Sequence, residues 1–465
     1  MANLSKIFFF NKQIRQIIWD PFWWLILMAI ILWIPFLRVW WWLFFPLILS
    51  IELRTLYMWW MNWDYYYPKV KWVVLEITPP KEILTPLKAM EDVFTIMWGP
   101  LLNVPNWREH WCEGVMKDAA EWMSWEVASI EGNLHFYIRV PQDYRLTLET
   151  ALYSHYPQLE IAEVPDYTKN VPQNIPNEEW DVYGEDFVLV QPSVYPIKTY
   201  EKFFEPQGEK IADEEKRLDP IASLLELMSR LGPNEQFWLQ FITMGVDDNS
   251  EPHWKRDVKK TINKLAKRPE KKIATLWEDI GSVLKNLALG PQKEGSGEKA
   301  TYKWYDARTS EEEDRELLLT GGEKELLIEV ENKAKKPIYR TNIRGVYVAK
   351  RDNWKASHKT LTRSYFAHFV SDNLNSIKFS TVTRPKTHYI FRKRIPFLRA
   401  RRQFRNFVTR LTPLFPDRKK EMALLNPEEL ATLYHFPIKI TGLVAPTMSR
   451  VESKKGGPPP NLPME

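Results

Sequence analysis

The chain has 465 residues, of which 45% are hydrophobic and 26% are charged, so it is long enough for roughly three globular domains. Its net charge of +5 excludes a polycation built wholly for nucleic acid, and its one cysteine excludes an internal disulfide or a thiolate zinc cluster. Its 22 tryptophans are unevenly spread, because ten of them lie within the first 63 residues.

An apolar stretch covers residues 21–51, in which Arg38 is the only charged side chain. About 20 apolar residues are needed to cross a bilayer core as a helix. The 17 residues before Arg38 and the 13 after it fit either a helical hairpin or one kinked span, and a buried core helix is a third possibility. Basic residues on both sides favour the hairpin, and no small-residue cleavage site supports a signal peptide.

We therefore expect a membrane anchor over residues 1–66, with one or two transmembrane helices. Indole rings are common at membrane interfaces, where the ring lies in lipid and its N–H meets the headgroups. The residues expected to hold the anchor are Trp23, Trp24, Trp33, Arg38, Trp40, Trp41 and Trp42.

Residues 67–170 carry short segments with strand and helix periods, and they form the first expected domain. In chain order the expected elements are a strand at 71–79, a helix at 85–99, two strands in 121–140 around the Glu131–Gly132–Asn133 turn, a helix at 141–157 and a strand at 158–164. This βαββαβ order is that of a ferredoxin-like unit.

Residues 180–390 repeat that order and form the second expected domain. The elements are a strand at 185–199, a helix at 219–232, strands at 235–246 and 337–350, a helix at 358–371 and a strand at 375–384. An insertion at about 247–336 carries amphipathic helical patterns and a flexible Gly-containing stretch. We expect an α+β fold with a transmembrane hairpin followed by two ferredoxin-like units, the second with this helical insertion; an unrelated second α+β domain is the alternative.

The sequence shows no catalytic, cofactor-binding or metal-binding motif. The eight histidines form no HExxH pair, and no GxSxG elbow is present. The stretch nearest to a phosphate-binding loop, "GPQKEGSGEKAT", has Ser296 and Gly297 where Lys and Ser or Thr are required. Cys112 and His110 lie too close in sequence to argue for a catalytic couple. We therefore expect a chain without enzymatic activity, cofactor or metal.

Two segments are strongly basic. Residues 255–272 hold nine Lys and Arg, and residues 384–410 hold ten with no acidic residue and several aromatic rings. Such a segment can bind nucleic-acid phosphates, anionic lipid or an acidic protein, or it can be the solvated face of a core helix. The expected nucleic-acid or lipid contacts are Arg392, Lys393, Arg394, Arg399, Arg401, Arg402 and Arg405.

Three stretches, residues 124–167, 219–241 and 426–437, resemble the membrane-proximal region that precedes the motor in bacterial type IV secretion and conjugative DNA-transfer ATPases of the HerA–FtsK superfamily. In that family a motif similar to "ELATLYHFP" and a Pro-rich linker lead into the P-loop motor. Here residues 391–440 hold the basic helix and the motif, and residues 441–465 form a Pro-rich tail expected to be disordered. Walker A is missing, so the resemblance does not carry ATP hydrolysis to this chain.

The resemblance implies a non-enzymatic, membrane-anchored component of a transfer machine. Its expected place is the bacterial inner membrane with the bulk of the chain in the cytoplasm, and its expected partners are a P-loop motor ATPase supplied in trans and other copies of itself. The expected motor contacts are Leu433, Tyr434, His435, Phe436 and Pro437. The alternative function is a membrane-tethered nucleic-acid-binding protein that uses residues 384–410.

Overall fold

The computed structural model describes nine main segments of the chain and several short pieces. The segments are residues 69–80, 85–102, 121–203, 219–246, 254–266, 319–371, 373–385, 392–410 and 422–437; the pieces are 29, 33–39, 42, 50, 57, 60, 83, 292–294 and 301–303. The chain divides into one unit of Met1–Lys69 with Pro105–Met116 and a second unit of Val70–Val104 with Lys117–Glu465.

In the described part of the first unit, helix bounds are defined only for α4 (Pro35–Val39), and residues 29, 33, 42, 50, 57 and 60 are also helical. No helix in the part of the chain that the structure describes is long and apolar enough to cross a membrane. This finding corrects the predicted transmembrane hairpin and the description of the chain as a membrane protein.

The residues expected to anchor the chain are only partly covered by the structure. Arg38 lies in α4, and the side chains of Trp33 and Trp42 are exposed. The remaining four lie outside the described residues: Trp23, Trp24, Trp40 and Trp41.

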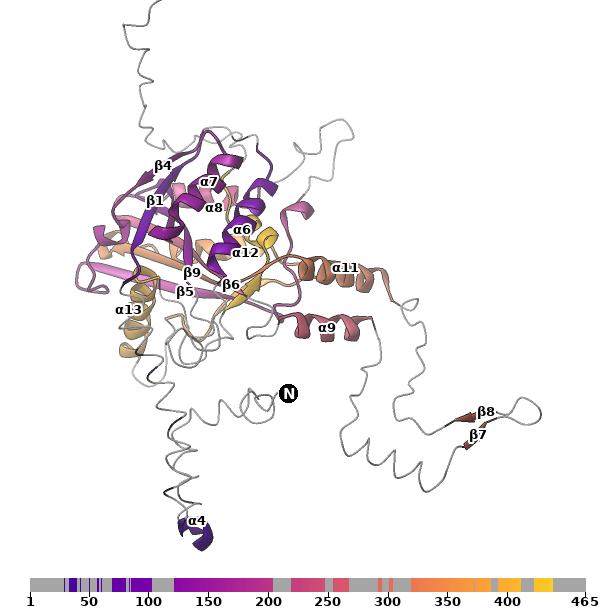
Figure 1. Ribbon diagram of the computed structural model, residues 1–465. Coiled ribbons are helices and arrows are strands. Elements are labelled where there is room, and N and C mark those ends of the chain that lie inside the picture. Colours follow the sequence, from indigo (N-terminus) through magenta and orange to yellow (C-terminus); the bar gives the residue numbers. More distant parts are fainter. Residues whose placement is uncertain are drawn as a thin grey trace, which may run out of the picture. The chain divides into compact units, whose positions relative to one another are not determined.

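The second unit is built on a nine-stranded antiparallel sheet (Figure 1). Its strands are β1 (Trp72–Thr78), β2 (Met123–Ile130), β3 (Asn133–Pro141), β4 (Glu160–Glu163), β5 (Trp180–Leu189), β6 (Glu235–Val246), β9 (Ile338–Lys350), β10 (Ile377–Phe379) and β11 (Ala423–Leu425). Their order across the sheet is β10-β5-β9-β6-β2-β3-β1-β4. Strand β11 pairs with Tyr339–Thr341 of β9, on the stretch of β9 that β5 does not reach.

The strands from both predicted domains lie in this one sheet. Each half has the same pattern of strand order, β4-β1-β3-β2 and β10-β5-β9-β6. The halves join where β2 pairs with β6, from Met123 opposite Thr243 to Ile130 opposite Gln236. This pairing removes two strand edges that would otherwise be open to solvent, and one hydrophobic core runs beneath both halves. The predicted fold class, two ferredoxin-like units behind a transmembrane hairpin, is therefore wrong: the fold is α+β with one large antiparallel sheet.

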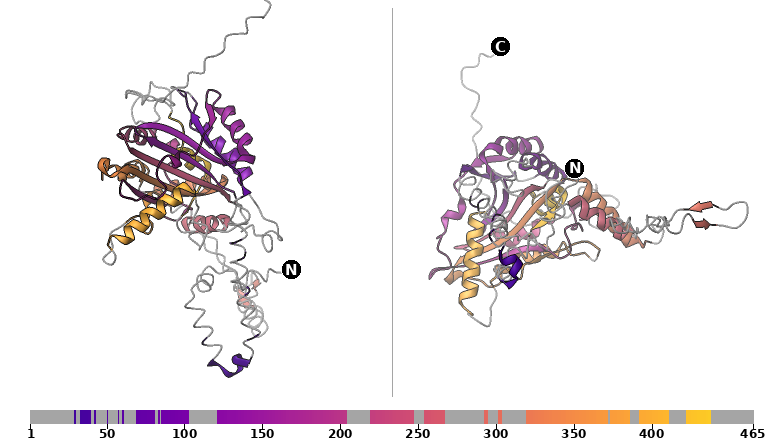
Figure 2. Two further views of the ribbon diagram at one scale, coloured as in Figure 1. Left: turned by 90° about the vertical axis from the view of Figure 1, so that its left-hand side faces the viewer. Right: turned by 60° about the horizontal axis from the view of Figure 1, so that its bottom comes forward.

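Helices cover both faces of the sheet (Figures 1 and 2). The helices that pack on the first face are α6 (Lys88–Leu101), α7 (Arg145–His155), α8 (Ala222–Ser229), α12 (Leu361–Ala367) and α14 (Pro427–Leu433). Helix α13 (Arg394–Val408) packs on the opposite face, here called the α13 face. Short 3₁₀ turns are η4 (Gln142–Tyr144), η5 (Tyr167–Asn170), η6 (Tyr200–Lys202), η8 (Arg351–Asn353) and η9 (His358–Thr360).

The turn between β2 and β3 follows from its two central residues. Glu131 and Gly132 both have positive φ, 54° and 88°, as a two-residue hairpin turn of the primed type requires. A Cβ on Gly132 would lie 2.8 Å from the carbonyl oxygen of Ser229, so a larger residue would also collide with the end of α8. The turn that the sequence predicts at this position is present.

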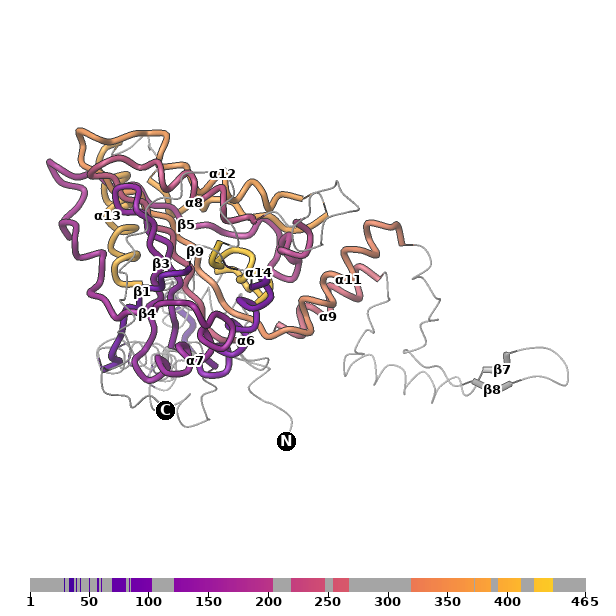
Figure 3. The backbone as a smooth tube through the Cα atoms, turned by 90° about the horizontal axis from the view of Figure 1, so that it is seen from above, coloured from indigo at the N-terminus to yellow at the C-terminus, as the bar shows by residue number. Residues whose placement is uncertain are grey.

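The insertion between β6 and β9 forms an arm of two helices, α9 (Trp254–Leu265) and α11 (Gly321–Lys335), which lie side by side and extend away from the sheet (Figure 3). Helix α11 begins with a capping box between Thr320 and Glu323. Trp254, Val258 and Val330 join a small apolar cluster at the base of the arm. The same insertion carries the two-stranded pair β7 (Gln292–Glu294) and β8 (Thr301–Lys303).

Candidate functional site

Helix α13 packs on the sheet through its apolar side. Phe404 and Phe407 are buried, and their ring centroids lie 6.2 and 5.4 Å from that of Trp238 on β6. Gly184 on β5 permits a close approach, since a Cβ there would lie only 2.7 Å from Cβ of Gln403. The helix is therefore held directly against the strand.

Buried polar contacts fix the carboxyl-terminal part of α13. Gln403 Nε2 donates to Asp186 Oδ2 at 2.7 Å, and Arg344 Nε donates to Asp186 Oδ1 at 2.8 Å. Arg344 Nη1 also donates to the carbonyl oxygen of Asn406 at 2.8 Å. A cation at this end of a helix interacts favourably with the helix dipole.

Arg410, two residues beyond α13, is buried in a charged network on the same face. Its Nε donates to Glu126 Oε1 at 2.9 Å, and its Nη2 donates to Asp166 Oδ1 at 3.0 Å. Tyr167 Oη donates to Glu126 Oε2 at 2.8 Å. Burial by itself raises the pKa of Glu126, but the charge of Arg410 and the hydrogen bonds from Arg410, Ser124 and Tyr167 outweigh burial, so the pKa is lowered. Arg410 thus holds the helix to the sheet.

The opposite side of α13 presents four arginines, Arg394, Arg401, Arg402 and Arg405, here called the arginine face. Their spacing of seven, eight and eleven residues places them within about 100° of arc on a helix. Arg401 is half-exposed, and the other three are exposed. Within the described segments, no carboxylate forms an ion pair with any of the four, in contrast to Arg344 and Arg410.

The other predicted basic contacts lie around this face. Arg392 and Lys393 are exposed just before the helix begins. Arg399 is half-exposed on another side of the helix and donates to the carbonyl oxygen of Arg384 at 3.2 Å. Phe397 and Leu398 add exposed apolar surface at 40% and 49%.

Residues 422–437, here called the C-terminal strap, run through the core of the sheet domain. Every residue of the strap is buried except Glu428, which is half-buried. Asn426 caps α14 by accepting from Glu429 N at 2.8 Å, while Glu429 Oε2 accepts from Asn426 N at 2.9 Å. Pro427 occupies the first turn of α14, where no N–H is required.

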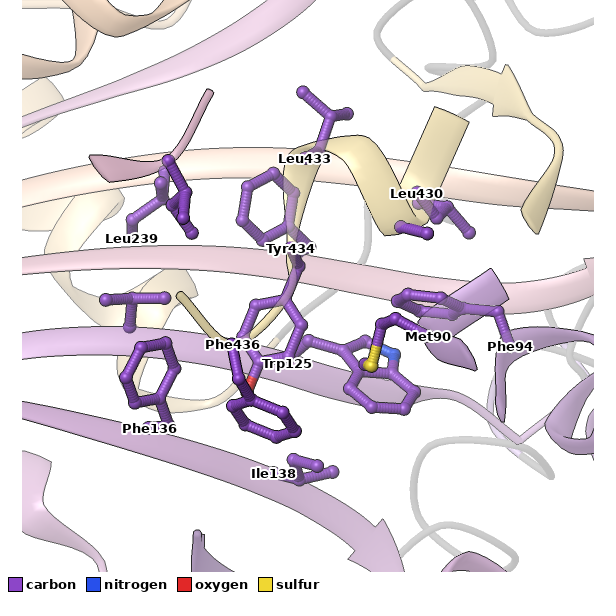
Figure 4. Packing of buried hydrophobic residues seen from close by; sticks show 14 of the residues in the cluster. Met90, Phe94, Trp125, Phe136, Ile138, Leu239, Leu430, Leu433, Tyr434 and Phe436 are labelled. Carbon is purple, nitrogen blue, oxygen red and sulfur yellow. The ribbon is translucent and has the colours of Figure 1, made fainter. Parts of the chain in front are cut away.

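The aromatic end of the strap fills the middle of the helix-covered core (Figure 4). The Tyr434 ring centroid lies 5.5 Å from that of Trp125 on β2, 6.2 Å from Phe136 on β3 and 6.3 Å from Phe241 on β6. Phe436 packs 5.5 Å from Phe136. The strap therefore contacts strands of both halves of the sheet.

Buried charges tie the strap to its neighbours. Glu429 Oε1 accepts from Lys333 Nζ at 3.0 Å and from Ile197 N at 2.9 Å. Burial raises the pKa of Glu429 and lowers the pKa of Lys333. Lys336 Nζ lies 2.7 Å from Glu428 Oε2, and His435 Nε2 lies 2.8 Å from Asp219 Oδ1. The strap is thus tied to the base of the arm and to the start of α8.

The five residues predicted to contact a motor all belong to the buried strap: Leu433, Tyr434, His435, Phe436 and Pro437. Their side chains face the core of this chain. Within the described residues, these side chains are therefore not presented at the surface for a partner. Neither Lys333 nor Arg410 was predicted as a site residue, because their carboxylate partners are distant in sequence.

No protein-family model and no curated protein matches this chain. Within the described residues, no group of three or more His, Cys, Asp and Glu is placed to hold a metal ion. The resemblance to the motor-preceding region of HerA–FtsK ATPases therefore stays a prediction.

Proposed function

We propose that this chain is a non-enzymatic platform of a type IV secretion or conjugation-like transfer machine, and that a P-loop motor ATPase engages the segment after Pro437. The burial of the C-terminal strap across both halves of the sheet carries this proposal. A load applied to the chain after Pro437 passes into the strap, and from there into strands β2, β3, β6 and β9. We expect a domain built in this way to move as one body when the strap is pulled.

The resemblance in sequence supports the same proposed function. The strap contains the "NPEELATLYHFP" stretch that is similar to the segment before the motor in the HerA–FtsK family. The described contacts give this stretch a physical role, because each turn of it is bonded or packed within the domain.

A binding measurement tests the proposal. The full chain and a chain ending at Pro437 are immobilised and exposed to the purified P-loop ATPase encoded nearest to this chain. We expect the full chain to bind and the shortened chain to lose at least about tenfold in affinity, equivalent to about 1.4 kcal/mol. Both chains keep the strap, so the difference reports on the segment after it.

A matched variant separates sequence from length. Residues 458–463, "PPPNLP", are replaced by Gly and Ser at equal length. We expect weakened binding, because a flexible linker lacks the stiffness of a Pro-rich one. Equal binding by the full and shortened chains, or no binding by the full chain, would overturn the proposal.

A second candidate function is nucleic-acid binding through the arginine face, which the exposure of its arginines and their lack of carboxylate partners in the described segments support. Guanidinium groups bind phosphate oxygens in a bidentate manner, and each neutralised phosphate of a duplex contributes about −0.9 to the salt slope of log K. Replacing Arg394, Arg401, Arg402 and Arg405 by Gln should therefore weaken duplex binding and lower the slope by about 3 to 4.

The arm supplies a control of equal charge for this second candidate. Lys255, Arg256, Lys259 and Lys260 on α9 are also exposed, and their replacement by Gln removes the same charge from another surface. Fluorescence anisotropy with a labelled duplex of about 20 base pairs, at salt between about 50 and 200 mM, compares the two variants. Equal losses in both variants would indicate non-specific attraction and would rule out the arginine face as the site.

A further inference from the structure

Arg139 lies on the α13 face of the sheet, in β3. It stands opposite Ser124 of β2, whose Oγ donates to Glu126 on that face. The Arg139 Cζ atom lies 4.1 Å from the ring centroid of Trp72 on β1. The rings of Trp72 and Trp122 are 5.1 Å apart. The guanidinium is thus held over an aromatic surface by a cation–π contact.

No described residue forms a hydrogen bond or ion pair with the Arg139 side chain. Its Nη1 atom is buried and has no hydrogen-bond partner among the described residues. A buried donor without a partner is costly, and native proteins rarely keep one without a reason. Arg139 as a whole is only partly buried, so part of the residue is accessible to solvent.

The electrostatic surroundings of Arg139 favour an added anion. Burial and the positive charge of Arg410 together lower the pKa of Arg139 to about 10, against the raising effect of Glu126 and Asp166. Both carboxylates are already bound by Arg410. The surroundings of Arg139 therefore destabilise its charged guanidinium. An anion bound at Nη1 would stabilise that charge.

We propose that Arg139, supported by Trp72, binds a phosphate group. A guanidinium offers a planar fork that matches two phosphate oxygens, and the stacked Trp72 ring fixes the orientation of the fork. The phosphate has two possible sources, a small free phosphate compound or the backbone of a nucleic-acid strand on the α13 face. The inference is independent of the proposed platform function, because it concerns another face of the sheet.

Calorimetric titration tests the site with two ligands. Orthophosphate and a single-stranded deoxyoligonucleotide are titrated separately into the full chain, into Arg139→Gln and into Arg145→Gln. Arg145 is the control, because it is already paired with Glu149 at 2.7 Å and with Glu163 on another part of the domain. We expect Arg139→Gln to lose at least about tenfold in affinity for the ligand that binds and Arg145→Gln to keep it.

The pattern of results identifies the source. Orthophosphate binding that depends on Arg139 assigns a small free phosphate compound. Oligonucleotide binding that depends on Arg139, without measurable orthophosphate binding, assigns a nucleic-acid backbone. Binding that is the same in Arg139→Gln and in the unaltered chain, or no binding of either ligand, overturns the proposal.

A measurement on the unaltered chain covers the case in which Arg139→Gln fails to fold. Phenylglyoxal modifies accessible arginines, and peptide mass spectrometry reports the rate at each position. Orthophosphate or the oligonucleotide should slow the modification of Arg139 at least about threefold and leave that of Arg145 unchanged. Equal rates with and without both ligands would overturn the proposal.

Discussion

Lys333 Nζ lies 2.9 Å from Glu429 Oε2 inside the core, with the two side chains 1% and 0% exposed. The pair joins helix α11 at the base of the arm to helix α14 of the C-terminal strap. Burial lowers the pKa of the lysine and raises that of the glutamate, so both shifts oppose the charged forms. Such a pair fixes geometry more than it adds net stability.

Replacing one partner of this pair should therefore lower the free energy of unfolding far more than replacing both. We expect Lys333→Met or Glu429→Gln alone to lower the free energy of unfolding by about 3 to 5 kcal/mol, because an unpaired polar or charged group remains buried. The double variant Lys333→Met, Glu429→Gln should recover most of the loss, because the glutamine amide oxygen can still accept from Ile197 N or Asn426 N. Denaturant unfolding at pH 7 measures all three. Lys324→Met, an exposed site on the same helix, is the control; additive losses in the double variant would contradict the expectation.

The ion pair between Glu126 and Arg410 should make the free energy of unfolding decrease at acidic pH. The pKa of Glu126 is lowered in the folded chain, so its contribution is fully present above the pH at which a free glutamate titrates, about 4.3, and is lost as pH falls through the lowered pKa. Below about pH 4.3, Glu126→Gln should show a weaker pH dependence of unfolding than the unaltered chain, together with lower stability at pH 7.

The control for this acid effect is Glu160→Gln, at an exposed position on β4. That variant should follow the pH profile of the unaltered chain. Identical pH profiles for Glu126→Gln and the unaltered chain would mean that Glu126 titrates normally and that the ion pair with Arg410 does not form in solution.

Most single helices and strands follow from local sequence patterns, whereas their assembly does not. The strand expected at 235–246 coincides with β6, and the helix expected at 85–99 is α6 (Lys88–Leu101). Strand β2 shows the limit. Seven of its eight residues are buried, because helices cover one face and polar groups the other while both edges are paired. The alternation in "MSWEVASI" indicates a strand but carries no information about a partner more than a hundred residues away.

In the candidate sites, too, local sequence patterns predict some features, whereas contacts between distant residues are seen only in the structure. The basic composition of residues 384–410 predicts a charged surface, and the spacing of Phe404 and Phe407 indicates which side of the helix is buried. Arg410 departs from this pattern because its carboxylate partners lie 284 and 244 positions earlier in the chain. Arg139 is one basic residue in an alternating strand, and only the structure shows that its Nη1 has no hydrogen-bond partner in the part of the chain that is described.

The absence of a side chain at Gly184 should determine how closely α13 packs against β5. An alanine Cβ there would lie 2.7 Å from Gln403 Cβ and 3.3 Å from Val346 Cγ2, so the helix has to move. We expect Gly184→Ala to lower the free energy of unfolding by about 1 to 3 kcal/mol and to speed hydrogen exchange in residues 394–408. Gly345→Ala is the matched control, because its Cβ would meet ordinary contacts at 3.5 Å. Equal exchange in the two variants would show that α13 does not depend on this close approach.

The folded chain should be at least as stable when the hydroxyl group of Tyr434 is removed. The ring packs among Trp125, Phe136 and Phe241, and the buried hydroxyl has no hydrogen-bond partner in the described part of the chain. Tyr434→Phe removes that unsatisfied group, so we expect the free energy of unfolding to stay equal or rise by up to about 1 kcal/mol. Tyr434→Ala, which also empties the ring site, should cost about 3 to 5 kcal/mol.

Tyr365 provides the contrast, since its hydroxyl donates to the carbonyl oxygen of Leu433 in the strap at 3.0 Å. Tyr365→Phe removes a hydrogen bond and leaves that carbonyl without its donor, so it should cost about 1 to 3 kcal/mol. The two Tyr→Phe variants thus differ in sign although both residues are fully buried in one core. Similar losses in both would show that the Tyr434 hydroxyl has a partner in solution, and that the strap is held at Tyr434 by polar contact as well as by packing.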